Sequence, residues 1–140
     1  MSRRDLTLPL LGVALALLAG CAGPGPAPGA MAPPGGEYQR GSALFGMPDY
    51  IPGQGTLYVK PWTVPLGPFL AYDKESHLVS TMYMVPIRDL RAHRDFEDLA
   101  VAPGMKPQRV QLYYQDAHPG VVEAHYHVVL WYVPEEEEPK

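Results

Sequence analysis

The sequence predicts an α+β domain, mainly an antiparallel β-sheet made of two hairpins and a short N-terminal strand, with one helix packed on it. Runs rich in β-branched and aromatic residues recur at short spacing, and the longer runs are separated by polar or Pro-Gly turns. One charged segment that follows a proline has apolar residues at helical spacing. All of these lie within residues 38–134, a length that suits a single domain with one modest core.

The first strand and the first hairpin are expected in the N-terminal half of this domain. Residues 56–59, Thr-Leu-Tyr-Val, directly follow a Gly53-Gln54-Gly55 turn. Residues 69–72 and 77–85 are then typical of two strands, joined by the polar cluster Asp73-Lys74-Glu75-Ser76. We expect these two strands to pair.

The expected helix begins after Pro86 and continues to about Leu99. Proline suits the first turn of a helix, because its missing N–H would have no partner there. The apolar residues that would share one face are Ile87, Leu90, Phe96 and Leu99. The segment Ala102-Pro103-Gly104 would end the helix.

The second hairpin is expected from residues 109–115 and 121–133, connected through His118-Pro119-Gly120. Residues 135–140 follow as an acidic tail. Four consecutive glutamates at positions 135–138 repel one another, so we expect the tail to stay solvated and to hold no site.

Residues 1–20 have the pattern of an export signal. Arg3 and Arg4 precede a short apolar stretch at residues 6–18, which ends in small residues. A stretch of this length is too short to cross a bilayer as a stable helix, which needs about 20 apolar residues. We therefore expect these residues to be removed on export.

The sequence Leu18-Ala19-Gly20-Cys21 is similar to the lipobox of bacterial lipoproteins, in which the cysteine is lipidated and becomes the new N-terminus. Cys21 is the only cysteine, so the exported protein has no disulfide bond. The prediction is an extracytoplasmic protein that is anchored to a membrane by lipid on Cys21. With Ala22 and no aspartate after the cysteine, the anchor would be in the outer membrane if the host has one.

Residues 21–37 would join the lipid to the domain. From residue 22 to residue 36 the chain is almost entirely alanine, glycine and proline, with too few side chains to bury. Such a composition predicts a disordered tether, which proline would partly stiffen. The alternative is an ordered arm that wraps on the domain.

The charge of the chain excludes one class of partner. Without residues 1–20 the protein has 9 basic and 14 acidic side chains, a net charge of −5 with neutral histidines. A mildly acidic protein without a basic stripe does not suit the binding of nucleic acid, which depends on contacts to phosphates.

Three of the five histidines lie in the second hairpin. Alternate residues of a strand share a face, so His125 and His127 would present two imidazoles side by side. This geometry can bind a divalent transition metal such as Zn, Mn, Fe or Cu, with His118, and Glu123 or Asp116, as further candidate ligands. The alternative is that these histidines only hydrogen-bond tyrosines or the backbone of a half-buried sheet.

Nucleophilic catalysis has no candidate in the sequence. There is no Gly-x-Ser-x-Gly motif, and the single cysteine is assigned to lipid. No cofactor other than a metal is indicated, and no small-molecule ligand can be named.

Three segments carry a resemblance to a known family. They are the runs GPFLAYDKE at residues 67–75, LVSTMYMVP at residues 78–86 and HPGVVEAHYH at residues 118–127. Over residues 55–133 the chain resembles a family of small extracytoplasmic proteins of unknown function from thermophilic and related bacteria. One branch of that family is linked to an extracytoplasmic-function sigma/anti-sigma stress system.

The resemblance implies a sheet-rich domain that assembles into a closed homo-oligomer, and it implies no established reaction. The family's usual Pro-His-x-x-x-His segment is replaced here by Glu-Ala-His-Tyr-His, so a site carried over from the family falls on His125 and His127.

Two functional hypotheses follow from the sequence. The first is a non-enzymatic envelope lipoprotein that self-associates or binds a ligand, with a stress-related role. The second is a metal-binding protein or metalloenzyme that uses the His-x-His strand.

Overall fold

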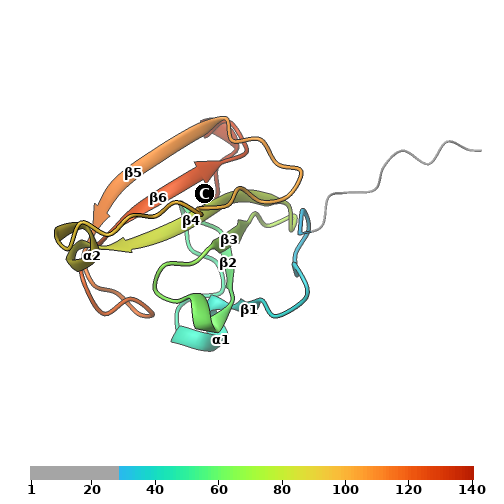
Figure 1. Ribbon diagram of the computed structural model, residues 1–140. Helices are drawn as coiled ribbons and strands as arrows, with labels where there is room; N and C mark the ends of the chain where they lie inside the picture. The colour runs from blue at the N-terminus through green and yellow to red at the C-terminus, as the bar shows by residue number, and fades with distance from the viewer. Residues whose placement is uncertain (1–28) are drawn as a thin grey trace, which may run out of the picture.

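Six antiparallel strands form one sheet around the long strand β4 (Figure 1). The computed structural model describes residues 29–140, so the predicted export signal and Cys21 lie outside the described residues. The strand order is β1-β2-β3-β4-β6-β5. The strands are β1 (Gln39–Arg40), β2 (Thr56–Val59), β3 (Phe69–Tyr72), β4 (Leu78–Pro86), β5 (Arg109–Gln115) and β6 (His125–Trp131).

Helical structure is limited to four short pieces in the described part of the chain. Two are α-helices, α1 (Gly41–Phe45) and α2 (Ile87–Arg91), and two are 3-10 turns, η1 (Pro61–Thr63) and η2 (Glu135–Glu137). Among residues 29–140, none of the helices has the length and apolar character that crossing a bilayer requires. The predicted fold class, an α+β domain dominated by antiparallel sheet, is confirmed.

Both predicted hairpins form. β3 pairs with β4 across the turn at residues 73–76, and β5 pairs with β6 over the full length of both strands. The last strand is shorter than expected. It begins at His125 instead of Val121, because His118 and Val121 form an isolated bridge that makes residues 118–121 part of the turn.

The helix after Pro86 is also shorter than expected. It ends at Arg91 instead of continuing to Leu99, and His93 then has a φ of 56°, a left-handed conformation that stops a helix. The Arg94 side chain pairs with Asp89 at 3.0 Å across this stop. Phe96 therefore does not lie on a helical face, and residues 92–108 run without regular structure to β5.

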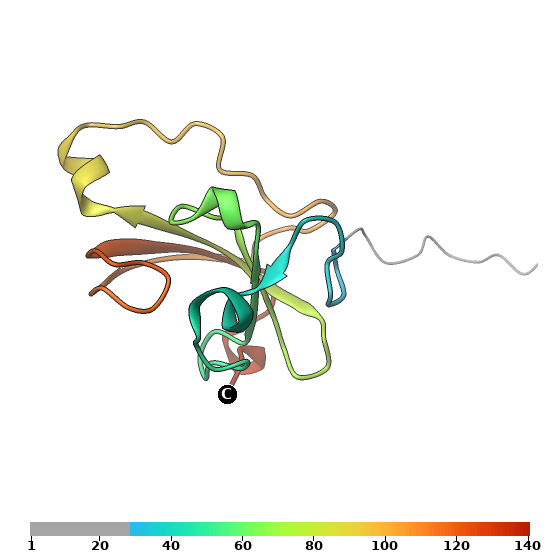
Figure 2. The ribbon, with the colours of Figure 1, turned by 90° about the horizontal axis from the view of Figure 1, so that it is seen from below.

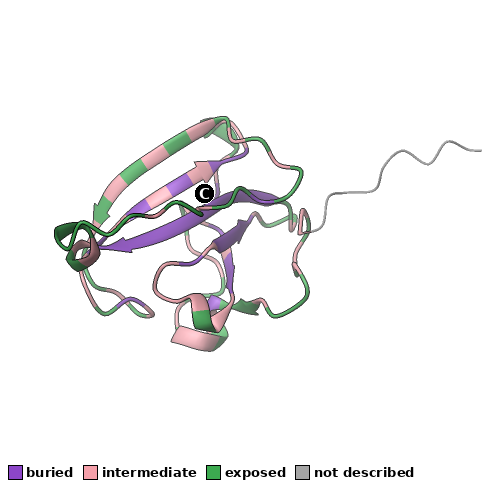
Figure 3. Cartoon of the chain, in the orientation of Figure 1, coloured by how far each residue is buried: buried purple, intermediate pink, exposed green. Residues whose placement is uncertain are grey.

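Apolar residues cover both faces of the sheet. In Figure 2 the segment from α2 to β5 passes along one side, while α1 and the loop between β5 and β6 lie on the other. The α1 side holds the larger cluster, centred on Val59, Phe69 and Met82. The opposite side holds a tyrosine-rich cluster with Tyr58 and Tyr72. β4 is buried along its whole length, as its uniform colour in Figure 3 shows.

The expectation of a disordered tether is wrong for residues 29–32, and residues 22–28 of the expected tether lie outside the described residues. Ala32 N–H donates to the Ser76 carbonyl at 2.8 Å, and Leu78 N–H donates to the Ala30 carbonyl at 2.9 Å. The Tyr72 hydroxyl donates to the Gly29 carbonyl at 2.6 Å. Although few of these residues have side chains to bury, their backbone carbonyls and amides find partners at the β3–β4 turn. The alternative of an ordered arm applies to this stretch.

The acidic tail is solvated only in part. The side chains at positions 135–137 are exposed, as expected, but Glu138 forms an ion pair with Arg109 and Pro139 is buried. Gly53 N–H also donates to the Pro139 carbonyl at 2.8 Å. Repulsion among the glutamates does not keep the tail free, because Arg109 on the edge strand offers a cationic partner at its end.

Candidate metal centre

The structure brings His118, His125 and His127 together on the α1 side of the sheet. β6 places His125 and His127 on the same face, and both are essentially fully buried, at 0% and 1% exposure. His118 reaches them from the turn between β5 and β6 and stays partly exposed. The side chains of β6 alternate between the two faces as predicted, and His118 joins His125 and His127 in the cluster, as the sequence suggested.

The three imidazoles face one another through their Nε2 atoms. The distance between the Nε2 atoms of His125 and His127 is 2.9 Å, and that between the Nε2 atoms of His118 and His125 is 3.2 Å. One ring nitrogen from each histidine lies within 4.8 Å of the other two. Ligand nitrogens around tetrahedral zinc, with bonds of about 2.0–2.1 Å, lie about 3.3 Å apart. The observed spacing is close to that of a metal site.

Each Nδ1 atom has its own partner on the outer side of the cluster. His125 Nδ1–H donates to the Glu123 carbonyl at 2.8 Å, and His118 Nδ1–H donates to the Pro119 carbonyl at 2.9 Å. The Nδ1 atom of His127 lies 2.7 Å from the Tyr113 hydroxyl. Partners of this kind hold metal-binding histidines in one tautomer and one orientation.

These partners leave lone pairs at the centre of the cluster. A carbonyl can only accept, so the Nδ1 atoms of His118 and His125 carry protons and their Nε2 atoms do not. These two Nε2 lone pairs then face each other across 3.2 Å. A proton on His127 Nε2 can satisfy the lone pair of His125 but leaves that of His118 unpaired. A single cation between the three atoms satisfies all of them.

Burial favours the neutral form of His125 and of His127, which is the form that binds a metal. It lowers the pKa of His125, and it lowers the pKa of His127 to about 4, with the nearby His125 and His118 adding to the effect. Neutral imidazole is the ligand form, so no proton has to leave His127 before a metal binds at neutral pH.

The metal-free protein is expected to lose stability as the pH falls from 6.5 to about 4. In this pH window an unfolded histidine binds a proton, whereas His127 in the folded protein does not. Lowering the pH therefore stabilises the unfolded state relative to the folded state. The shift corresponds to roughly 3 kcal/mol in the free energy of unfolding. Urea denaturation of the chelator-treated protein at several pH values measures it, with His127→Gln as the comparison.

Because aspartates and glutamates titrate in the same range, the decisive quantity is the difference between wild type and His127→Gln. Tyr113, His118 and His125 surround His127 in both proteins. An unchanged pH slope in the variant would mean that His127 does not contribute.

Comparison with solved structures finds a protein similar to this chain. No family model matches the chain, and no curated protein matches it. The crystal structure of the hypothetical protein TTHB210 from Thermus thermophilus is similar, with 41% sequence identity and a TM-score of 0.58. The match covers 64% of this chain and 87% of the Thermus chain. The chain belongs to the family of this Thermus protein. The description of that relative names no function.

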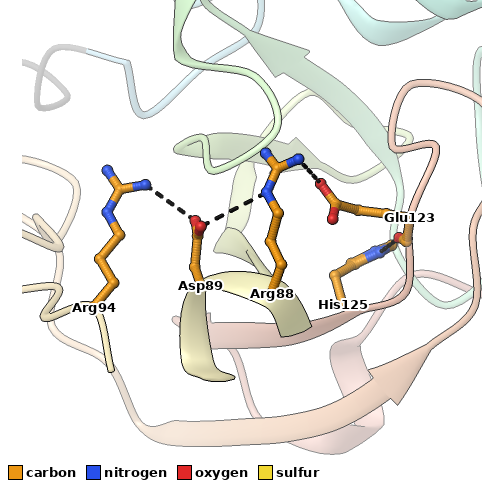
Figure 4. Close-up of polar contacts among 5 residues, drawn as sticks. All are labelled: Arg88, Asp89, Arg94, Glu123 and His125. Carbon is orange, nitrogen blue, oxygen red and sulfur yellow. Dashed lines mark hydrogen bonds and ion pairs between the residues drawn. The ribbon is translucent and has the colours of Figure 1, made fainter. Parts of the chain in front are cut away.

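Glu123 does not supply a ligand to the cluster. Figure 4 shows its carboxylate directed to Arg88 of α2, at 3.0 Å, while its backbone carbonyl accepts from His125. The prediction of Glu123 as a ligand is wrong because the strand starts at His125, so the strand alternation does not extend back to position 123. Asp116 is also occupied elsewhere, by the Tyr114 hydroxyl at 2.6 Å.

Tyr113 is the member of the site that sequence reasoning missed. It lies directly opposite His127 in the β5–β6 register, and its ring is 4.8 Å from the imidazole between centroids. Opposed residues of an antiparallel pair share a face, so a correct hairpin register would have predicted the contact. The sequence alone predicted the pairing of the strands but not their register.

Gly120 fixes the turn that carries His118. Its φ is 92°, and a Cβ atom at this position would lie 2.8 Å from the Phe45 ring of α1. The close contact between this turn and α1 therefore depends on glycine.

Gly120→Ala is expected to lower the free energy of unfolding by about 2 kcal/mol, from the left-handed backbone and the contact with Phe45 together. Urea denaturation measures the loss. Gly35→Ala is the matched control, because its φ is also positive, at 77°, but nothing lies within 4 Å of an added Cβ. Equal losses in the two variants would show that the Phe45 contact is not important.

Proposed function

We propose that this protein binds a divalent transition metal through His118, His125 and His127 at the surface of the cell envelope. The observation that carries the proposal is the convergence of three Nε2 atoms whose Nδ1 atoms each have a separate partner. Hydrogen bonds among the histidines alone leave a lone pair of the cluster unpaired, whereas a cation pairs all three.

The ligand set narrows the choice among Zn, Mn, Fe and Cu. Imidazole suits Zn, Cu and Fe, whereas Mn prefers carboxylate oxygens, and no carboxylate of the described residues joins the three histidines. Three protein ligands also leave one position of a tetrahedral metal open, the arrangement of catalytic zinc sites. At such a position a metal can lower the pKa of a bound water to about 7.

Metal content tests the proposal directly. The full-length protein, purified without a histidine tag, is expected to contain close to one transition-metal ion per chain after loading with Zn, Fe or Cu and gel filtration, by inductively coupled plasma mass spectrometry. The His125→Ala/His127→Ala double variant should contain none. His77→Ala is the matched control, because His77 is exposed and remote from the cluster in the sheet. A wild-type protein that stays free of all three metals would refute metal binding.

The envelope location rests on the lipobox-like sequence that ends in Cys21. In cells grown with labelled palmitate, the wild-type protein is expected to carry label and to fractionate with membranes. Cys21→Ser should lose both properties. A labelled Cys21→Ser protein, or an unlabelled wild type, would contradict lipid anchoring.

Self-association is a second candidate function, favoured by the outer face of β5. Val110, Leu112 and Tyr114 are 62%, 64% and 49% exposed on a strand at the edge of the sheet. Alternating exposure along β5 is visible in Figure 3. An apolar stripe on an unpaired edge is typical of an interface. Light scattering at micromolar concentration should show an oligomer that Leu112→Glu dissociates, and a monomeric wild type would exclude it.

A further inference from the structure

A pocket beside the three histidines is suited to hold a small organic ligand. It has a volume of about 340 Å³, within the usual range for ligand sites, and lies between the loop at residues 46–54 and the turn that follows β5. His118 forms part of its wall. Most of the other lining residues are apolar, including Met47, Ile51 and Leu57.

The pocket approaches the cluster at His118, the histidine that is partly exposed. His125 and His127 are buried, whereas His118 is partly exposed and lines the pocket. Two other lining residues are the direct cross-strand neighbours of the buried histidines, Gln115 of His125 and Met84 of His127. Opposed residues of antiparallel strands share a face, so the wall of the pocket includes one histidine of the cluster and a direct neighbour of each of the other two.

The net charge of the metal and its ligands determines which kind of molecule would bind at the open coordination position of the metal. Three neutral imidazoles leave the full double positive charge on a bound metal, and Glu123, the acidic residue nearest in sequence to His125, is paired with Arg88. An anion therefore complements the site. The apolar walls favour an aliphatic or aromatic body behind the anionic group, and the amides of Gln54 and Gln115 line the same pocket and can donate to a second oxygen.

We propose that the pocket binds a small carboxylate with an apolar body, whose carboxylate occupies the open metal position and whose body contacts Met47, Ile51 and Leu57. This inference rests on the proposed metal site. It assigns the substrate or ligand class of that site.

Cobalt(II) provides the test, because its visible absorption reports both metal binding and an added ligand. The full-length protein is loaded with Co²⁺ and titrated with acetate, propionate, butyrate and hexanoate. Each methylene buried in the pocket should tighten binding about fourfold, from about 0.8 kcal/mol per methylene. Hexylammonium, which has the same body and the opposite charge, should leave the spectrum unchanged.

A variant locates the apolar body. Ile51→Ser is expected to weaken hexanoate binding by about tenfold and to leave acetate binding unchanged, because only the longer chain reaches position 51. Val101→Ser is the matched control, because Val101 is 39% exposed beside Ala102 of the tyrosine-rich cluster on the opposite side of the sheet, and it should alter neither affinity.

The outcomes separate this inference from the proposed function. Equal affinities along the carboxylate series would show that anions bind the metal without the pocket and would refute the inference alone. A cobalt spectrum that no carboxylate changes would do the same. If no cobalt spectrum forms, the metal site itself is refuted, and the inference with it.

Discussion

Replacing His127 by alanine is expected to lower the affinity for a divalent transition metal by more than about 100-fold. Changes to the outer partners of metal-binding histidines typically cost about 10–100-fold, and the loss of a ligand should exceed that range. His127 is 1% exposed, so no water from bulk solvent can easily take its place. The loss also leaves the Nε2 atom of His125 without its 2.9 Å neighbour. Competition with a chromophoric chelator measures the affinity.

Two further variants should lower the metal affinity less than His127→Ala, or not at all. Tyr113→Phe removes only the hydroxyl beside His127 Nδ1 and should weaken metal binding by about tenfold. Glu123→Gln should leave the affinity unchanged, because that carboxylate contacts Arg88 and not the centre. If Glu123→Gln weakens binding as much as His127→Ala, the ligand set inferred from the three histidines is incorrect.

Metal binding is expected to raise the midpoint of thermal unfolding by roughly 16–32 °C. A ligand that binds only the folded state stabilises it by about 4 kcal/mol when its free concentration is 1,000 times its Kd. For a domain of this size each kcal/mol shifts the midpoint by roughly 4–8 °C. The three histidines meet only in the folded state, because they come from the turn before β6 and from β6 itself, which pairs with both β4 and β5. Calorimetry with and without Zn²⁺ measures the shift.

Magnesium is the matched control ion, because it prefers oxygen ligands and should not change the midpoint. The His125→Ala/His127→Ala protein should show no shift with zinc. A zinc-induced shift of equal size in that variant would place the stabilising ion elsewhere on the protein.

The parts of the fold that the sequence predicted are those with a strong local signal. The β3–β4 hairpin has two apolar runs around a cluster of four polar residues, and both its strands and its turn are confirmed. The same holds for β5 and β6, where alternating residues of β6 face inward as expected. Burial on one face of a strand imposes a period of two, and this period is visible without a structure.

The errors in the fold arise where tertiary contacts override local pattern. Ile87 and Leu90 are three residues apart, as are Phe96 and Leu99, a spacing typical of a helix. The chain nevertheless turns at His93 and crosses the sheet, where the Tyr83 hydroxyl donates to the Ala100 carbonyl at 2.7 Å. The arm at residues 29–32 has no side-chain signal at all. Its position depends on backbone hydrogen bonds to the β3–β4 turn, which composition cannot reveal.

The sequence predicted which histidines form the candidate site, but it did not predict the residues that surround them. The His-x-His pattern places His125 and His127 on one face, and the short turn brings His118 within reach of them. Tyr113 required the strand register, and the position of the Glu123 carboxylate depended on Arg88 of α2, a helix that precedes the whole second hairpin. The residues that contact the histidines and their neighbours come from separate strands and helices, so a local sequence motif does not predict them.

β4 separates the arm from the histidines. The arm bonds to the chain at Ser76 and Leu78, where β4 begins, whereas His125 is paired with Pro86, where β4 ends. Nine extended residues span about 26 Å. In a chain tethered through its N-terminal side, this strand acts as a rigid spacer, and the three imidazoles sit at the far end from the point of attachment. A lipid anchor would then hold the centre out from the bilayer, within reach of molecules that diffuse in the surrounding compartment.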